Sequence, residues 1–187
     1  MNANSEFLDR QDCVLLLVDV QKSMLDLCEE PALVLKSTAA LIEIAGLCGV
    51  PVLFTAQNVE KLGGVIPELI AAAPPTSVLP KMEFNCFENE GIAAAVRETG
   101  RKTLLLAGIE GHICIFHTGL GALRRGFRVH VASDAVTSKG ALNKETGLRR
   151  LDRAGAVISS TGMMIFELLQ RAGTAEFRAA LPLLKKL

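Results

Sequence analysis

Short apolar runs alternate with stretches of helical periodicity along most of the chain. The apolar runs predict strands at residues 13–18, 51–55, 78–80, 103–107, 128–132 and 156–159. Helical patterns occupy residues 31–48, 67–73, 90–99, 112–125 and 143–154, and two further helical pieces split near Gly173 end the chain. A proline opens the helix at Pro31, Asn143 is the expected N-cap of a later helix, and glycines follow several helix ends.

This alternation predicts the fold class. Strands that are apolar on both faces, with helices between them, are typical of a parallel sheet covered on both sides. We therefore expect an α/β fold: a three-layer, doubly wound, six-stranded parallel sheet. The chain has too few units for an eight-fold barrel. With no internal repeat or linker in 187 residues, we expect one domain spanning residues 1–187.

Composition excludes several classes of protein. Half of the residues are hydrophobic, which argues against disorder. Lys+Arg and Asp+Glu number 20 each, so the basic excess of a nucleic-acid-binding protein is missing. No apolar run approaches the roughly 18 residues of a membrane-spanning helix. Residues 1–12 lack the apolar core of a signal peptide. We expect no nucleic-acid partner and no membrane association.

The cysteines favour a reducing compartment. The chain has five of them, an odd number, and none in CxxC spacing. Neither a zinc ribbon nor a complete disulfide framework fits this pattern, and free thiols in the cytoplasm do. Four of the five, Cys13, Cys28, Cys48 and Cys86, are interpreted as structural.

Three chemically active residues follow predicted strands. Asp19 comes directly after the first strand, Lys81 after the third, and Cys114 lies at the start of the helix after the fourth. In an open α/β sheet, ligands bind at this carboxyl edge. A carboxylate, an ammonium group and a thiol are the parts of a cysteine nucleophile with a base and a cation. By spacing and composition alone, each residue has an ordinary structural interpretation: a turn aspartate, a solvated lysine and, as the more frequent case, a core cysteine.

Physical chemistry gives each of these residues a role. A thiol attacks as the thiolate, which a helix N-terminus and a nearby ammonium group both stabilise. A carboxylate can accept the thiol proton and return it to a leaving amine. The glycine-rich turn at residues 107–111 can direct backbone N–H groups at a developing oxyanion.

These segments resemble the isochorismatase-like cysteine hydrolases, over residues 14–169. GIEGHICIFHTGLGALRRGFRVHVASDAVTSK at 108–139 is similar to the nucleophile segment of that family. LLLVDVQKSML at 15–25 and LPKMEFNCF at 79–87 are similar to its aspartate and lysine motifs. The resemblance implies a catalytic triad of Asp19, Lys81 and Cys114. It also implies a cis peptide bond between Ile109 and Glu110, with the backbone N–H groups of Glu110 and Cys114 forming an oxyanion hole.

Two departures from family patterns narrow the chemistry. The Asp-x-His metal motif of the nicotinamidases is replaced by TAQNVEKLGG at 55–64. We therefore expect no metal and no cofactor, and a substrate other than nicotinamide. Members that act on the vinyl ether isochorismate typically lack the cysteine that this chain keeps. The resemblance is strongest to small, metal-free members, and it implies hydrolysis of C–N bonds other than peptide bonds.

Other polar and aromatic residues are secondary candidates. Gln57 is expected to contact either substrate or a neighbouring subunit, Phe84 to shape the pocket, and His112 to line the site. His130, inside a predicted strand, is interpreted as structural or surface-exposed. Asp134 and Ser138 are interpreted as turn residues after the fifth strand.

The sequence therefore leads to one function with two alternatives. The main hypothesis is a metal-independent cysteine hydrolase that cleaves a small amide-like or ester carbonyl substrate through a thioester acyl-enzyme. The first alternative is an oligomeric binding or scaffold protein that keeps the triad without turnover, since the apolar stretch at 163–169 favours self-association. The second is a vinyl-ether hydrolase with Cys114 as a bystander. In each case we expect a homo-oligomer.

Overall fold

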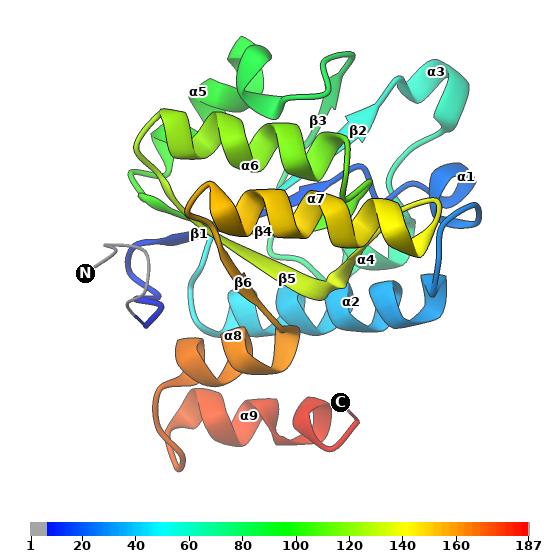
Figure 1. Ribbon diagram of the computed structural model, residues 1–187. Coiled ribbons are helices and arrows are strands. Elements are labelled where there is room, and N and C mark those ends of the chain that lie inside the picture. The colour runs from blue at the N-terminus through cyan, green and yellow to red at the C-terminus, as the bar shows by residue number, and fades with distance from the viewer. Residues whose placement is uncertain (1–6, 187) are drawn as a thin grey trace.

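A six-stranded parallel sheet forms the centre of the protein (Figure 1). The structure is a computed structural model that describes residues 7–186. In the sheet the strands lie in the order β3-β2-β1-β4-β5-β6, which confirms the predicted doubly wound α/β class. The strands are β1 (Cys13–Val18), β2 (Val52–Gln57), β3 (Val78–Lys81), β4 (Thr103–Ile109), β5 (Arg128–Thr137) and β6 (Val157–Ser159).

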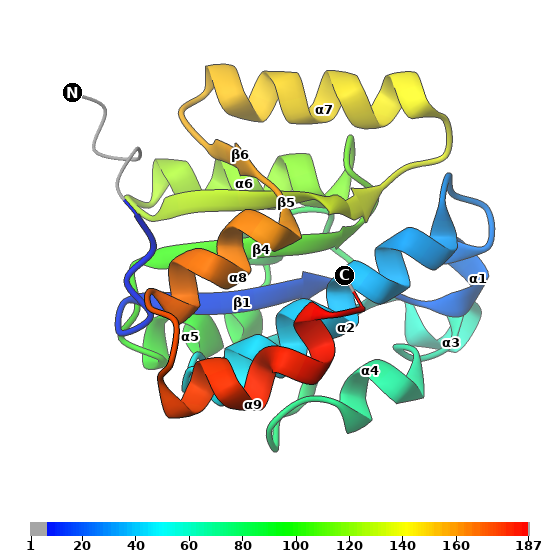
Figure 2. The ribbon, with the colours of Figure 1, turned by 90° about the horizontal axis from the view of Figure 1, so that it is seen from below.

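Helices cover both faces of this sheet. One face carries α5 (Glu90–Glu98), α6 (Cys114–Arg124) and α7 (Ala141–Arg153). The opposite face carries α2 (Pro31–Leu47), α4 (Pro67–Ala71), α8 (Thr161–Leu169) and α9 (Ala175–Leu184), as Figure 2 shows. The remaining short helices are α1 (Lys22–Leu25), α3 (Val59–Leu62) and the 3₁₀ turn η1 (Cys86–Glu88).

Side chains of the central strand β1 alternate between the two layers. Leu15 and Leu17 pack with the core beneath α2, whereas Val14, Leu16 and Val18 pack with the core beneath α6. A strand buried on both faces needs an apolar residue at each position, and this is why β1 reads as a continuous apolar run. Packing on both faces therefore fixes the position of β1 and of Asp19, the residue that follows it.

Strand β5 is longer than its apolar run. The sequence predicted an end at residue 132, but the strand continues to Thr137 past a register irregularity opposite Leu106 and Gly108 of β4. One polar residue in this extension, Asp134, was expected in a turn. Its Oδ1 instead accepts hydrogen bonds from the amide and hydroxyl groups of Thr161 at the start of α8. Polar residues inside strands are tolerated when their hydrogen bonds are satisfied.

Two other predictions about local structure were wrong. Helix α7 begins at Ala141 with Gly140 as its N-cap, so Asn143 lies inside the helix and its side-chain amide donates to the Lys139 carbonyl. The segment after β2 holds two short helices, α3 and α4, where the sequence predicted one. Among residues 7–186, no helix is long and apolar enough to cross a membrane.

Candidate active site

The three predicted catalytic residues meet at the carboxyl edge of the sheet. Asp19 follows β1, Lys81 is the last residue of β3, and Cys114 is the first residue of α6. Because β1 lies between β2 and β4, Asp19 stands where the order of the strands reverses. This switch point is where open α/β sheets bind ligands.

Short contacts join the three side chains. Lys81 Nζ lies 2.6 Å from Asp19 Oδ2 and 3.6 Å from Cys114 Sγ. The Lys81 and Asp19 side chains are fully buried, and Cys114 is nearly so. The hydroxyl group of Thr55, at the end of β2, donates a 2.8 Å hydrogen bond to Asp19 Oδ1. One oxygen of the Asp19 carboxylate therefore contacts the ammonium group, and the other accepts a hydrogen bond from a hydroxyl group.

Gln57 holds the ammonium group from the other side. Its Oε1 accepts a 2.6 Å hydrogen bond from Lys81 Nζ, and its Nε2 donates to the Met82 carbonyl at 2.9 Å. The Glu83 carbonyl also accepts from Lys81, at 3.0 Å. The sequence offered Gln57 as a contact for substrate or a neighbouring subunit. Both ends of its amide are engaged within the chain, and contact of Gln57 with substrate or a subunit stays a prediction.

A second glutamine fixes the backbone of the first. Gln21 is fully buried. Its Nε2 donates to the Gln57 carbonyl, and its Oε1 accepts from the Gln57 amide. The Gln21 amide in turn donates to the Asp19 carbonyl at 2.7 Å. The segments that carry the acid and the lysine are therefore tied together through two buried side-chain amides.

The electrostatics favour a neutral thiol beside an ion pair. Burial, together with the negative charge of Asp19, raises the pKa of the Cys114 thiol to about 12, although the Lys81 charge acts in the opposite direction. Burial disfavours the charged form of Lys81, but the Asp19 carboxylate raises the pKa of Lys81 above its ordinary value. The sequence had indicated a stabilised thiolate. These shifts favour a protonated Cys114 and a charged Lys81 at neutral pH, and thiolate formation during reaction stays a prediction.

The turn before α6 has an unusual backbone. The peptide bond between Ile109 and Glu110 is cis. The Glu110 carboxylate accepts a 2.8 Å hydrogen bond from the Lys139 amide, and the Glu110 carbonyl accepts from the amides of Ile113 and Ile115. Among residues 7–186, no acceptor is found for the amides of Glu110 and Cys114. This turn therefore leaves two N–H groups at the entrance of the helix that carries the thiol.

A glycine brings the turn close to Asp19. Gly108 has a φ of +122°, and a Cβ atom at this position would lie 2.0 Å from the Val18 carbonyl oxygen. A side chain therefore cannot be accommodated where β4 passes the end of β1. This close approach is what brings the end of β4 beside the residue that follows β1.

The remaining sequence candidates lie around this centre without joining it. His112 Nδ1 is 3.1 Å from Ser138 Oγ and 3.9 Å from the Glu110 carboxylate. Phe84 is 55% exposed, and its ring centroid lies 6.3 Å from that of His117. Cys86, interpreted from sequence as structural, is fully buried, and its amide donates to the Thr118 hydroxyl group one helical turn after Cys114. Burial raises the pKa of Cys86 to about 11.

Sequence reasoning missed Gln21 and Thr55 as parts of the site. Each is a polar residue next to, or inside, a buried apolar run, and this contrast was the available signal. An open cavity of about 610 Å³ adjoins the site, and its lining includes Lys81, Met82 and Glu83. Within residues 7–186, no three His, Cys, Asp or Glu side chains are grouped so that they could hold a metal ion.

Known proteins similar to this chain share most of its length. The model of the isochorismatase domain matches residues 13–162. The secreted isochorismatase effector Isc1 of Phytophthora sojae is 35% identical over 177 residues, covering 92% of this chain and 84% of its own length.

Two solved structures of YcaC are also similar. YcaC from Pseudomonas aeruginosa, described with hexane-2,5-diol and covalent acrylamide, is 28% identical with a TM-score of 0.89, covering 96% of this chain and 92% of that one. YcaC from Escherichia coli, described as an octameric hydrolase of unknown specificity, is 28% identical with a TM-score of 0.86, covering 96% and 88%. With the family model matched over residues 13–162, this chain belongs to the isochorismatase-like family of hydrolases.

Proposed function

We propose that this chain is a metal-independent cysteine hydrolase with Cys114 as its nucleophile. The observation that carries the proposal is the position of Lys81 Nζ, 2.6 Å from Asp19 Oδ2 and 3.6 Å from Cys114 Sγ. A buried acid, a buried cation and a thiol at one point provide a base, an electrostatic anchor and a nucleophile. The substrates are small molecules with an amide-like or ester carbonyl group, and C–N bonds other than peptide bonds are the preferred target.

The first half-reaction forms a thioester. Asp19 accepts the proton of Cys114 as the sulfur attacks the carbonyl carbon, and the Lys81 ammonium group stabilises the sulfur while its charge develops. The tetrahedral intermediate then collapses. Asp19 returns the proton to the leaving nitrogen or oxygen, which departs as an amine or alcohol. The acyl group remains on Cys114.

The second half-reaction restores the thiol. Asp19 accepts a proton from a water molecule, and the oxygen of that water attacks the thioester carbonyl. Collapse of the second tetrahedral intermediate breaks the carbon–sulfur bond, and Cys114 recovers its proton from Asp19. The product is a carboxylic acid. Lys81 keeps its charge throughout.

Backbone N–H groups support the oxyanion in both steps. The amides of Glu110 and Cys114 find no acceptor among residues 7–186, so both are available to a substrate oxygen. The cis bond at Ile109–Glu110 belongs to the same turn. Loss of a single donor of this kind costs enzymes about 10²–10³ in turnover.

Acrylamide probes the nucleophilicity of Cys114, because a reactive thiol adds to its alkene to form a stable thioether. It carries both an amide carbonyl and an electrophilic alkene, and it is covalently present in the YcaC structure from P. aeruginosa. We expect intact-mass measurement to find a single adduct of this chain, mapped by peptide sequencing to Cys114. Asp19→Asn should suppress the adduct by at least tenfold, because the thiol proton then has no acceptor.

The matched control is Cys28, which is partly buried, whereas the other four cysteines are buried. Cys28→Ser should label like the wild type, and Cys114→Ser should not label. Equal labelling of Cys114→Ser and the wild type would contradict the proposal.

Adduct formation without release of product acid from a panel of small amides and esters would favour the binding-protein alternative. Retained activity of Cys114→Ser on isochorismate would favour the vinyl-ether alternative.

Self-association and a cytoplasmic location complete the proposal. The E. coli YcaC structure is described as octameric, and in this chain α8 exposes the large apolar side chains of Met163 and Phe166. The five cysteines are free, as a reducing compartment would keep them. The relative from P. sojae is named as secreted, so fractionation of the cells that make this protein is the test of location.

A further inference from the structure

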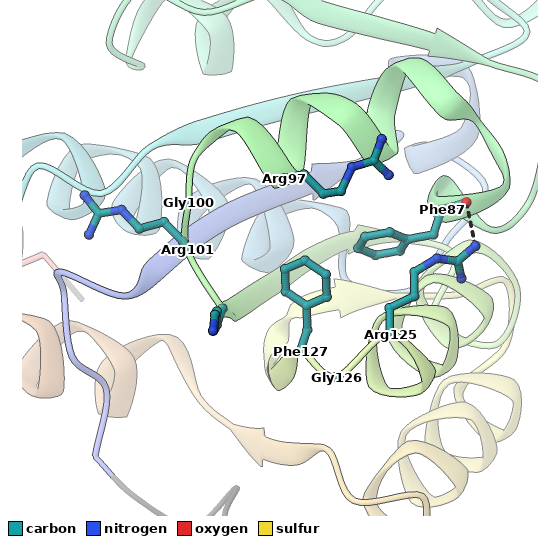
Figure 3. A pocket seen from close by; sticks show the side chains of 8 residues that line it. Phe87, Arg97, Gly100, Arg101, Arg125, Gly126 and Phe127 are labelled. Atoms are coloured by element: carbon teal, nitrogen blue, oxygen red, sulfur yellow. Dashed lines mark hydrogen bonds between the residues drawn. The ribbon is translucent and has the colours of Figure 1, made fainter.

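A cavity of about 550 Å³ lies at the opposite edge of the sheet from the triad (Figure 3). It is bounded by the ends of α5 and α6 and by the residues that lead into β4 and β5. Strand β4 separates it from the catalytic edge, and seven residues of strand span about 20 Å. Its lining includes Phe87, Arg97, Arg101, Lys102, Arg125 and Phe127.

The charges around this cavity do not balance. Arg97 pairs with Glu90, and an Arg125 nitrogen lies 3.6 Å from the Glu88 carboxylate. Within residues 7–186, neither Arg101 nor Lys102 has a carboxylate partner. Two positive charges are therefore left over at one place on a chain whose formal net charge is zero.

Helix ends explain only half of these cations. The carbonyl groups at a helix C-terminus attract positive charge, which accounts for Arg97 in the last turn of α5 and for Arg125 just after α6. Arg101 and Lys102 lie beyond the end of α5, in the connection to β4. The Arg101 guanidinium group reaches only a backbone carbonyl, that of Arg10, at 3.3 Å.

Aromatic rings line the cavity between these cations. The ring centroids of Phe87 and Phe127 are 5.4 Å apart, and Figure 3 shows the two rings next to each other. Phe87 is buried, whereas Phe127 is half-buried and so presents part of its ring to the cavity. Arg125 is held over the Phe87 ring, 5.4 Å from its centroid, and donates to the Phe87 carbonyl.

We propose that this cavity binds a nucleotide. The base would stack on the Phe127 ring, and Arg101 and Lys102 would contact the phosphate groups. Pockets for small ligands typically measure about 300–1,000 Å³ and combine an apolar lining with a few charged groups, as this one does. Guanidinium groups match phosphate oxygens in geometry as well as charge.

Isothermal titration with ADP tests the proposal on the full chain. We expect saturable binding at one site per chain at physiological salt. Adenosine, without phosphates, and inorganic pyrophosphate, without a base, should each bind at least tenfold more weakly. Lys102→Glu should weaken ADP binding by at least tenfold, because the reversed charge repels the phosphates. Lys185→Glu, an equal change of charge at an exposed site after α9, should leave it unchanged.

Three results would contradict a nucleotide site in this cavity. Absence of ADP binding, or equal affinity in the wild type and Lys102→Glu, would overturn the site. Equal affinity for pyrophosphate and ADP would overturn a nucleotide as the ligand. Acrylamide labelling of Cys114 should be the same in Lys102→Glu as in the wild type, so failure of this site is distinguishable from failure of the hydrolase proposal.

Discussion

The Lys81 ammonium group is fixed by acceptors from three segments of the chain. Asp19 follows β1, Gln57 ends β2, and Glu83 lies in the loop after β3. A buried charge is costly unless its hydrogen bonds are satisfied, and here each proton of the ammonium group has an oxygen within 3.0 Å. The distance between this charge and the thiol therefore depends on Gln57 as well as on the ion pair.

Replacing Gln57 should lower the reactivity of the Cys114 thiol without unfolding the protein. In Gln57→Leu the ammonium group loses one acceptor, and a hydrogen bond to a charged group contributes about 1.5–3 kcal/mol. We expect the rate of acrylamide labelling at Cys114 to fall about tenfold, and Gln57→Glu, which keeps an acceptor for Lys81, to recover part of the rate. The measurement is the labelling rate as a function of pH, with Gln11→Leu at an exposed turn as the control. An unchanged rate would contradict a role for Gln57 in positioning Lys81.

His130 makes stability depend on pH. The side chain is buried in β5, and burial, aided by the nearby Arg128 charge, lowers its pKa to about 4. The unfolded chain, with an ordinary histidine pKa near 6.5, binds more protons than the folded protein between pH 6.5 and 4. The contribution of His130 to the free energy of unfolding is therefore fully present above pH 6.5 and is lost as the pH falls toward 4.

Urea unfolding at two pH values measures this effect. Between pH 7.5 and pH 5 we expect the wild type to lose about 2 kcal/mol of unfolding free energy through His130 alone. His130→Gln should lack this part of the pH dependence, whatever its stability at pH 7.5. The same loss in both proteins would mean that His130 is protonated in the folded state.

The residues that sequence reasoning identified are those whose chemistry is rare at a strand end. Asp19, Lys81 and Cys114 are charged or nucleophilic residues after apolar runs. Gln57 was noticed, but its partners were not predicted. Its two hydrogen bonds reach residues 24 and 25 positions away, and only the folded sheet brings them together. Gln21 was missed for the same reason, since its partner in β2 is 36 positions away.

At the scale of elements, α7 supports the turn at the active site. Gly147 lies against this turn so closely that a Cβ atom would meet the Gly111 carbonyl oxygen at 2.6 Å and His112 Cα at 2.8 Å. Both neighbours are backbone atoms, so a side chain would displace the helix or the turn. The turn includes Glu110, whose amide we assign to the oxyanion hole.

Gly147→Ala should therefore impair both stability and reactivity. Overpacking costs typically about 1–3 kcal/mol, and displacement of the turn should slow acrylamide labelling of Cys114. Gly162→Ala in α8 is the matched control, because the nearest atom to its added Cβ would be 3.9 Å away. Unfolding in urea and the labelling rate provide the two readouts. If both variants behave alike, α7 does not set the position of the turn.

Elements were predictable where burial and periodicity agree. The limits of β1 were predicted as observed, and the helix predicted at 31–48 differs from α2 by one residue. Strand β5 was cut short because Ser133 and Asp134 break the apolar run. Hydrogen bonds from Thr161 and Ser37 satisfy the Asp134 carboxylate there, and the sequence does not show these contacts. Helices α1 and α3 have four residues each, too few for a periodic pattern to appear.

At the scale of the whole molecule, α8 presents an apolar surface. Met163 and Phe166 are 59% and 57% exposed and lie three residues apart, on one side of the helix. Large apolar groups gathered on a surface commonly mark an interface. This surface is our candidate for contact between copies of the chain.

Light scattering after size-exclusion chromatography tests this surface. We expect the wild type to have a multiple of the 20.0 kDa chain mass. Phe166→Glu should reduce that mass, because it places a charge in the interface. Leu142→Glu, a similar change at a 71% exposed position of α7, should not. A wild-type mass of one chain, or no change in Phe166→Glu, would contradict self-association through α8.

The protonated state of Cys114 has a consequence for the durability of the protein. Peroxides and other cellular oxidants consume thiolates far faster than thiols. Burial and the Asp19 charge raise the pKa of Cys114 to about 12, which favours the thiol over the thiolate at neutral pH. We therefore expect hydrogen peroxide to oxidise Cys114 more slowly than it oxidises an exposed thiolate.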